Sequence, residues 1–96
     1  MPQEIYKIIC LSTAHIPPET SKSIDENLSR GVWSSTISAF DYGWFVTVPK
    51  EEKDCWSTKY PYGMQNVLRY ANKHDCSYIL LDRDGPVEDD LAIYDW

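Results

Sequence analysis

Two acidic side chains follow an apolar run near the end of the chain. Tyr78–Leu81 has the length and composition of a buried strand, and Asp82-Arg83-Asp84-Gly85 comes directly after it. Carboxylates at positions i and i+2 beyond a strand can hold a hard cation and a phosphoryl group together. Asp82 and Asp84 are therefore candidate metal ligands, and Mg²⁺ is the cofactor that would suit them. The same residues also fit a purely structural role, an Asx-type turn that closes the strand.

A second group of polar side chains follows an earlier apolar run. Ile5–Leu11 is nearly continuous in apolar character, and Ser12, Thr13 and His15 come after it. In α/β sheets, ligands bind outside the carboxyl ends of parallel strands. If the first and last strands are parallel neighbours, these three side chains share one crevice with the two carboxylates. The sequence thus predicts a candidate ligand crevice at this edge of the sheet.

The run from Ile79 to Val87 resembles the first motif of the haloacid-dehalogenase phosphatases, an apolar strand followed by Asp-x-Asp-Gly and usually Thr. The resemblance implies a nucleophile at Asp82, a general acid/base at Asp84 and magnesium beside them. It ends after nine residues, and Pro86 stands where the family has Thr. In that family the motif lies at the start of the fold, and the lysine that the chemistry requires comes later in the chain. Here only ten residues follow Pro86, and none of them is a lysine. The residues therefore favour a non-enzymatic function over catalysis.

The other residues that could do chemistry give weaker signals. The two histidines, His15 and His74, have no zinc-like spacing with a cysteine, and Ser12 and Thr13 lack a nucleophile elbow. A His15 ring satisfied by hydrogen bonds near the start of a helix is favoured over a catalytic base. Three cysteines without a CxxC pair indicate reduced thiols, which favours a cytoplasmic location.

Two segments that would position these residues carry helix patterns. The first opens at Pro17-Pro18, where the missing proline N–H costs nothing, and stops at Gly31. The second repeats apolar residues at i, i+3, i+4 and i+7, which is one face of an amphipathic helix. The apolar positions are Ile24 and Leu28 in the first segment and Met64, Val67, Leu68 and Ala71 in the second.

The remaining apolar segments predict strands. Ile37–Phe40 and Trp44–Val48 are rich in strand formers. Asp41-Tyr42-Gly43 between them is either a hairpin loop, which we favour slightly, or a bulge in one long strand. The apolar character of the first and last strands indicates burial on both faces, as in a sheet covered by helices.

The elements therefore alternate in the order β-α-β(β)-α-β, followed by an acidic C-terminal tail. This order predicts an α/β fold, a small sheet of three to four strands with two helices and right-handed crossovers. We expect residues 1–96 to form a single domain, in which residues 50–61 are an exposed loop and residues 85–96 are the tail.

Charge is concentrated at the end of the chain. The net charge is −6, and residues 82–96 contain six acids against Arg83 alone. A direct nucleic-acid binder would show a basic face, so an unknown protein partner with a basic surface is the better electrostatic match. The acids would also serve as solvated residues that keep the protein soluble. No apolar run approaches the roughly 20 residues of a membrane span, so no membrane is expected.

The tail supplies a candidate partner surface. It comprises Glu88, Asp89 and Asp90 together with the aromatic residues Tyr94 and Trp96. A buried Trp96 that pins the terminus is the favoured interpretation. The alternative is an exposed Tyr-Asp-Trp peptide read by a partner, because aromatic residues often dominate interfaces.

A wider resemblance spans nearly the whole chain. Cys10–Ile16, Tyr42–Val46, Leu81–Val87 with Leu91, and Tyr94-Asp95-Trp96 look like a family of small uncharacterised bacterial proteins, often encoded on plasmids and other mobile elements. Its C-terminal motif is LDxDGPV…L…YDW. The family carries no established activity, so the resemblance implies a bacterial, cytoplasmic accessory protein.

Two functions are consistent with these observations. The first is a protein-interaction or regulatory module that uses the acidic C-terminal loop. The alternative is a site that binds a metal ion or a small ligand and could also hydrolyse that ligand. It would be built from Thr13, His15, Asp82 and Asp84.

Overall fold

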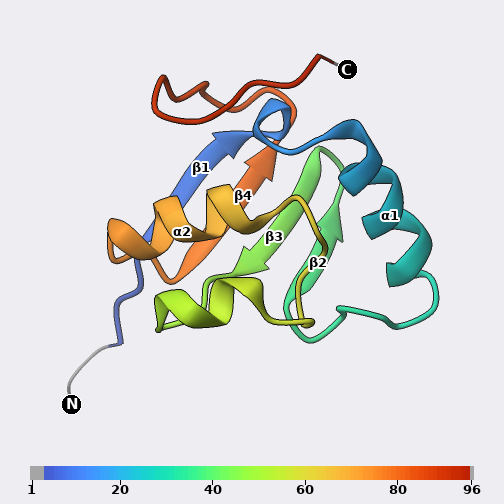
Figure 1. Cartoon of the computed structure of the whole chain (residues 1–96), viewed down its shortest axis with the longest axis horizontal. Coiled ribbons are helices and arrows are strands. Elements are labelled where there is room, and N and C mark those ends of the chain that lie inside the picture. Colours follow the sequence, from blue (N-terminus) through green and yellow to red (C-terminus); the bar gives the residue numbers. More distant parts are fainter. Residues whose placement is uncertain (1–3, 96) are drawn as a thin grey trace.

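The strands form one mixed four-stranded sheet in the computed structural model, which describes residues 4–95 (Figure 1). In spatial order the strands are β1 (Ile8–Ser12), β4 (Tyr78–Asp82), β3 (Gly43–Thr47) and β2 (Ile37–Phe40). β1 and β4 are parallel, with Ser12 level with Asp82, and the other two pairs are antiparallel. The predicted α/β class is confirmed, and the adjacency that the crevice hypothesis required is present.

β2 and β3 form a hairpin rather than one bulged strand. Phe40 pairs with Gly43, so the loop consists of Asp41 and Tyr42. Gly43 has a φ of +155°, and a Cβ added to it would lie 1.8 Å from the carbonyl oxygen of Leu81. Glycine therefore permits the close approach of β3 to β4.

Two helices cover one face of the sheet. α1 (Pro18–Leu28) has Pro18 in its first turn, and Gly31 beyond its end has the left-handed φ of +78° that the sequence predicts. α2 (Gln65–Lys73) crosses in front of the strands in Figure 1. Ile24 of α1 and Val67, Leu68 and Ala71 of α2 are buried in the same core. Within residues 4–95 no helix is long and apolar enough to cross a membrane.

The opposite face of the sheet is open. Successive side chains of a strand point to opposite faces, and one set, which includes Val46, Ile79 and Leu81, is buried in the core. The other set is not part of that core, and Ile8 is 55% exposed. The prediction that the first and last strands are buried on both faces is wrong, because α1 and α2 pack on the same side.

The segment 50–61 is more ordered than the predicted exposed loop. It contains the 3₁₀ helix η2 (Glu52–Trp56), and Cys55 and Tyr60 are buried. The Tyr60 hydroxyl donates a hydrogen bond to the Thr47 carbonyl oxygen, and burial raises the pKa of Tyr60 to about 12. Most residues of the segment are exposed, and the sequence does not indicate η2 because isolated apolar residues in a polar segment pack on the core without producing a sequence period. Trp56 remains 56% exposed.

Replacing Gly43 tests the close approach of β3 and β4. We expect Gly43→Ala to lower the free energy of unfolding by at least about 3 kcal/mol, since the new Cβ overlaps the Leu81 carbonyl. Gly31→Ala is the matched control, because nothing lies within 4 Å of its Cβ position. It should cost only about 1–2 kcal/mol for a left-handed alanine. Urea unfolding followed by tryptophan fluorescence measures both, and equal losses would contradict the steric argument.

Candidate functional site

The C-terminal tail crosses the carboxyl ends of β1 and β4 (Figure 1). The Ser12 N–H donates to the Pro86 carbonyl oxygen at 2.8 Å, and the Tyr94 N–H donates to the Ala14 carbonyl oxygen at 2.8 Å. Leu91 packs against the core from this side. The tail therefore lies where an α/β sheet would ordinarily bind a ligand.

His15 holds the tail through both ring nitrogens. Its side chain is 2% exposed and lies in the 3₁₀ helix η1 (Thr13–His15). Nε2 accepts a hydrogen bond from the Glu88 N–H at 2.8 Å, and Nδ1 lies 2.9 Å from the Ala92 carbonyl oxygen. Because Nε2 accepts, the proton is on Nδ1, which donates to Ala92. The favoured interpretation, a satisfied ring, holds, but its partners are the tail backbone rather than the start of a helix.

Asp82 and Asp84 form a hydrogen-bonded turn. Oδ1 of Asp82 accepts the N–H of Asp84 at 2.8 Å, and the Gly85 N–H donates to the Asp82 carbonyl oxygen at 2.8 Å. These bonds are those of the Asx-type turn that the sequence suggests. Among residues 4–95, no three His, Cys, Asp or Glu side chains are grouped to hold a metal ion.

Ser12 and Thr13, the other two crevice residues, are buried beside this turn. The Ser12 hydroxyl accepts a hydrogen bond from the Ala14 N–H at 3.1 Å and so caps η1. Parallel pairing brings Ser12 level with Asp82, as predicted. Binding of a ligand by these residues stays a prediction, and His15 has neither ring nitrogen left for a substrate.

Cys10 lies near Asp82 on the open face. It pairs with Leu80, two residues before Asp82 on the same face of β4. Burial raises the pKa of the Cys10 thiol, and the negative charge of Asp82 raises it further. The thiolate is therefore disfavoured by the same carboxylate that closes the turn.

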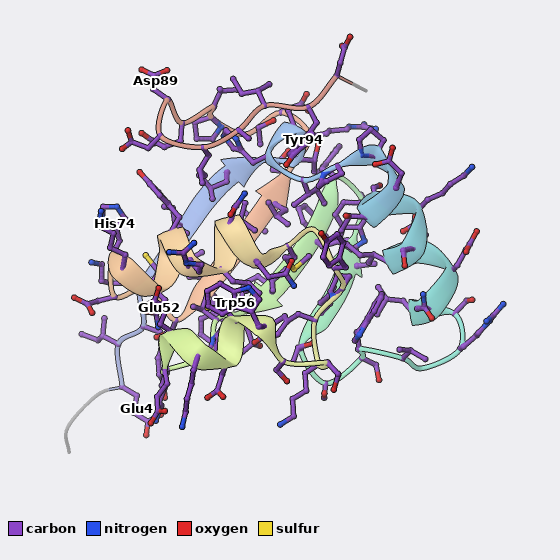
Figure 2. The ribbon with its side chains drawn as sticks, viewed as in Figure 1. Glu4, Glu52, Trp56, His74, Asp89 and Tyr94 are labelled. Carbon is purple, nitrogen blue, oxygen red and sulfur yellow. The ribbon has the colours of Figure 1, made fainter. Side chains whose placement is uncertain are left out.

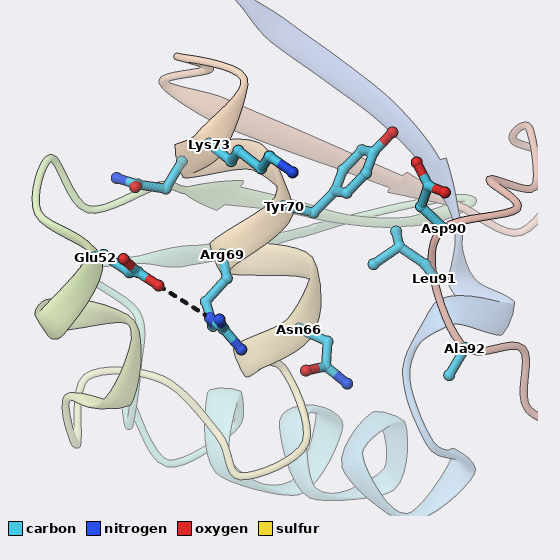
Figure 3. Close-up of a pocket in the computed structure, with 9 residues that line it drawn as sticks. Glu52, Asn66, Arg69, Tyr70, Lys73, Asp90, Leu91 and Ala92 are labelled. Atoms are coloured by element: carbon cyan, nitrogen blue, oxygen red, sulfur yellow. Dashed lines mark hydrogen bonds and ion pairs between the residues drawn. The ribbon is translucent and has the colours of Figure 1, made fainter.

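A groove separates the tail from α2 (Figure 3). It encloses about 510 Å³, with Asn66, Arg69, Tyr70 and Lys73 on the α2 side and Asp90 and Leu91 on the tail side. Arg69 Nε lies 3.3 Å from Glu52 Oε1, and the guanidinium lies 5.2 Å from the centre of the Trp56 ring. A second hollow of about 470 Å³ adjoins it through Asn66 and is lined in part by Trp56, Tyr62 and Tyr94.

Asp90 lines this groove, and the acids Glu88 and Asp89 directly precede it in the tail. Asp89 and Asp90 are exposed, and Glu88 is half-buried. The ion pairs within residues 4–95 are Lys53–Glu51 and Arg69–Glu52, so no tail acid belongs to one. Partial burial raises the pKa of the Tyr70 hydroxyl, and the charges of Glu88 and Asp90 raise it further. The tail acids therefore act electrostatically on the groove.

Sequence reasoning missed the groove. The amphipathic pattern leaves Asn66, Arg69 and Lys73 off the apolar face of the helix, and nothing in it indicates that the tail lies beside them. Leu91, an apolar residue directly after the acids, was the available signal, because it packs on the core and brings the tail beside α2. Of the predicted partner surface, Tyr94 is half-buried and lines the second hollow, whereas Trp96 lies outside the described residues.

A protein-family model matches most of the chain. The family model described as "Family of unknown function (DUF5983) C-terminal domain" matches residues 8–96. No curated protein and no solved structure matches the chain. The match agrees with the resemblance to a family without an established activity, while a bacterial source and a mobile-element context remain predictions.

Replacing His15 tests its role as the anchor of the tail. His15→Ala leaves the Glu88 N–H without its acceptor and opens a cavity, so we expect a loss of about 2–4 kcal/mol in the free energy of unfolding. Amide hydrogen exchange at Glu88 and Tyr94 should rise much more than exchange in β4. His74→Ala, at the exposed histidine, is the control and should change neither quantity. Equal acceleration in β4 and the tail would argue against a local anchor.

The alkylation rate of Cys10 tests whether the negative charge of Asp82 raises the pKa of its thiol. Iodoacetamide attacks the thiolate, so alkylation of Cys10 should require a higher pH than that of a free cysteine. Asp82→Asn removes a negative charge that disfavours the thiolate, which lowers the pKa of Cys10 and speeds alkylation at a fixed pH. Peptide mass mapping separates Cys10 from the buried Cys55 and Cys76. Asp84→Asn is the control, and an Asp82 variant that reacts no faster than the control would contradict the placement.

Proposed function

We propose that this chain, which belongs to the DUF5983 family of unknown function, is a protein-interaction module that binds a basic segment of a partner protein. The tail and the groove between it and α2 would form the binding surface. The observation that carries the proposal is a set of acids held in place without a counter-charge: within residues 4–95 none of Glu88, Asp89 and Asp90 is in an ion pair.

The tail is held in a defined position before any partner arrives. Four hydrogen bonds join residues 86–94 to the end of β1 and to η1, and two of them involve the buried His15. Figure 2 shows Asp89 pointing away from the body of the protein. A surface that is ordered in advance loses less conformational entropy on binding, which favours affinity.

The groove supplies an aromatic and apolar complement to the acids. Leu91 and Tyr70 line the groove, and Figure 3 shows Tyr70 pointing toward Asp90. Beside the second hollow Trp56 is 56% exposed and Tyr62 is 94% exposed. Tryptophan and tyrosine are enriched among the residues that dominate binding energy at interfaces. A partner segment would place lysine or arginine against Asp89 and Asp90 and its apolar residues in the hollows.

The proposed biological context of this function rests on features of the sequence. We place the protein among small accessory proteins of bacterial mobile elements, acting in the cytoplasm in a regulatory role. Its three cysteines are free thiols, which supports a reducing compartment. The net charge of −6 supports a basic protein partner rather than direct binding of nucleic acid.

Neutralising the three tail acids tests the proposal. An array of Lys/Arg-containing peptides supplies a defined probe, and fluorescence anisotropy measures its affinity at about 50 and about 300 mM salt. We expect Glu88→Gln with Asp89→Asn and Asp90→Asn to weaken binding at least about 10-fold at low salt and to flatten the salt dependence.

A second triple variant controls for net charge. Glu19→Gln with Asp25→Asn and Glu26→Gln changes the net charge equally, at exposed acids of α1. It should weaken binding by less than about 2-fold, because exposed charges beyond a Debye length of about 10 Å are screened. Equal weakening by both variants would contradict a local acidic site, as would an array without a basic ligand.

A further inference from the structure

The open face of the sheet carries a row of uncharged side chains that is apolar over three of its four strands. Cys10, Leu80, Phe45 and Ser38 are level with one another across the four strands. Because side chains alternate along a strand, these residues point away from the core that α1 and α2 cover. None of the four belongs to the hydrophobic core.

Aromatic rings extend this row at both ends of the strands. Phe45 stacks on Tyr78, with ring centres 5.0 Å apart and planes 25° apart. Tyr6 meets Tyr78 edge-on at 5.8 Å. Tyr6 is 53% exposed, Ile8 is 55% exposed and Tyr42, in the hairpin loop, is 50% exposed. The rings are packed against each other, yet their outer surfaces face solvent.

The exposed area of this patch is comparable to that of the largest apolar patch on a typical monomer. Each aromatic side chain presents roughly 150–250 Å², so the exposed parts of Tyr6, Ile8, Phe40 and Tyr42 alone amount to about 400 Å². The largest apolar patch of a typical monomer is about 300–600 Å² and is often functional. A standard interface buries about 800 Å² on each partner, of which somewhat over half is apolar. The open face thus offers the apolar area that one side of a stable interface requires.

The small number of charges on the face favours a second copy of this chain as its occupant, although the Tyr6 hydroxyl donates to the Glu4 carboxylate beside it. Within the described strands, Asp82 is the one charged side chain on this side of the sheet, and Arg83 follows it with its guanidinium 5.2 Å from the Tyr42 ring centre. Two copies of a chain with a net charge of −6 repel each other, and the repulsion is weakest between surfaces with little charge. A basic partner gains nothing from such a face, and single-stranded nucleic acid requires a basic one.

We infer that the open face is covered in solution by the same face of a second copy of this chain. Two sheets pack face to face about 10 Å apart, and a two-fold axis makes the contact isologous. Phe45, Leu80 and Ile8 of each copy would be buried in the contact. The surface is separate from the tail and its groove, so the inference does not depend on the proposed function.

Sedimentation velocity over roughly 1–500 µM protein tests the inference, a range that spans micromolar to submillimolar affinities. We expect a reversible monomer–dimer equilibrium. Ile8→Glu places a charge in the contact at a position exposed in the monomer, and it should raise the dissociation constant at least about 10-fold. Val32→Glu, at an exposed apolar residue beyond the end of α1, is the control and should change it less than about 2-fold. Circular dichroism checks that both variants are folded.

Alkylation of Cys10 gives a second readout on the unaltered chain. Its rate should fall as the wild-type protein is concentrated, because the dimer covers the thiol. A protein that stays monomeric throughout the range would overturn the inference, as would a dimer that both variants leave intact. A labelled single-stranded oligonucleotide that binds wild type and Val32→Glu but not Ile8→Glu would assign the face to nucleic acid and also overturn it.

Discussion

The position of the C-terminal tail depends on the hydrogen bonds that both ring nitrogens of His15 make to its backbone. The ring is buried at the end of β1, where it accepts from the Glu88 N–H and donates to the Ala92 carbonyl oxygen. An imidazole between one donor and one acceptor allows one tautomer, so the two contacts support each other. They place the tail across the strand ends, and the groove beside α2 exists because the tail lies there.

The one-sided packing of the helices is the second constraint. β1 and β4 are parallel neighbours, and α1 and α2 pack on a single face of their sheet. The core is complete on that side, with Ile24, Leu68 and Ile79 fully buried. The other side has aromatic residues that pack on each other, as Phe45 and Tyr78 do, and leave apolar surface in water. Helices on one face and a sheet form two packed layers around one core, and the open face of the sheet has the geometry to pack against a further layer.

The sequence predicts the elements better than their burial. The i, i+3, i+4, i+7 repeat identifies α2, and all four of its apolar residues are buried. The hairpin follows from Gly43, although its loop is one residue shorter than the three expected. The apolar run Ile5–Leu11 has the same composition whether a helix or solvent covers its second face, so Ile8 could not be placed from pattern alone. Long-range packing decides that question.

Local sequence patterns predict even less of the candidate site. If β1 and β4 are parallel neighbours, Ser12 and Asp82 lie side by side, as they do in the structure. The spacing of Asp82 and Asp84 also predicts the Asx turn. No local pattern connects His15 with Glu88, which are 73 residues apart in the chain. A polar residue at a strand end looks the same in sequence whether it awaits a ligand or bonds to a distant backbone.

The hydrogen bonds that join the tail to the end of β1 and to η1 do not involve its acidic side chains. Ser12, Ala14 and His15 all bond to backbone atoms of residues 86–94, so no carboxylate of Glu88, Asp89 or Asp90 takes part in those bonds. Concentrating like charges on one turn costs free energy, but the backbone bonds and the packing of Leu91 are independent of those charges. The position of the tail and the charge that it presents are therefore separate properties of the chain. Under the proposed function, substitution of the acids would therefore change the affinity for a partner while the groove and the sheet below keep their shape.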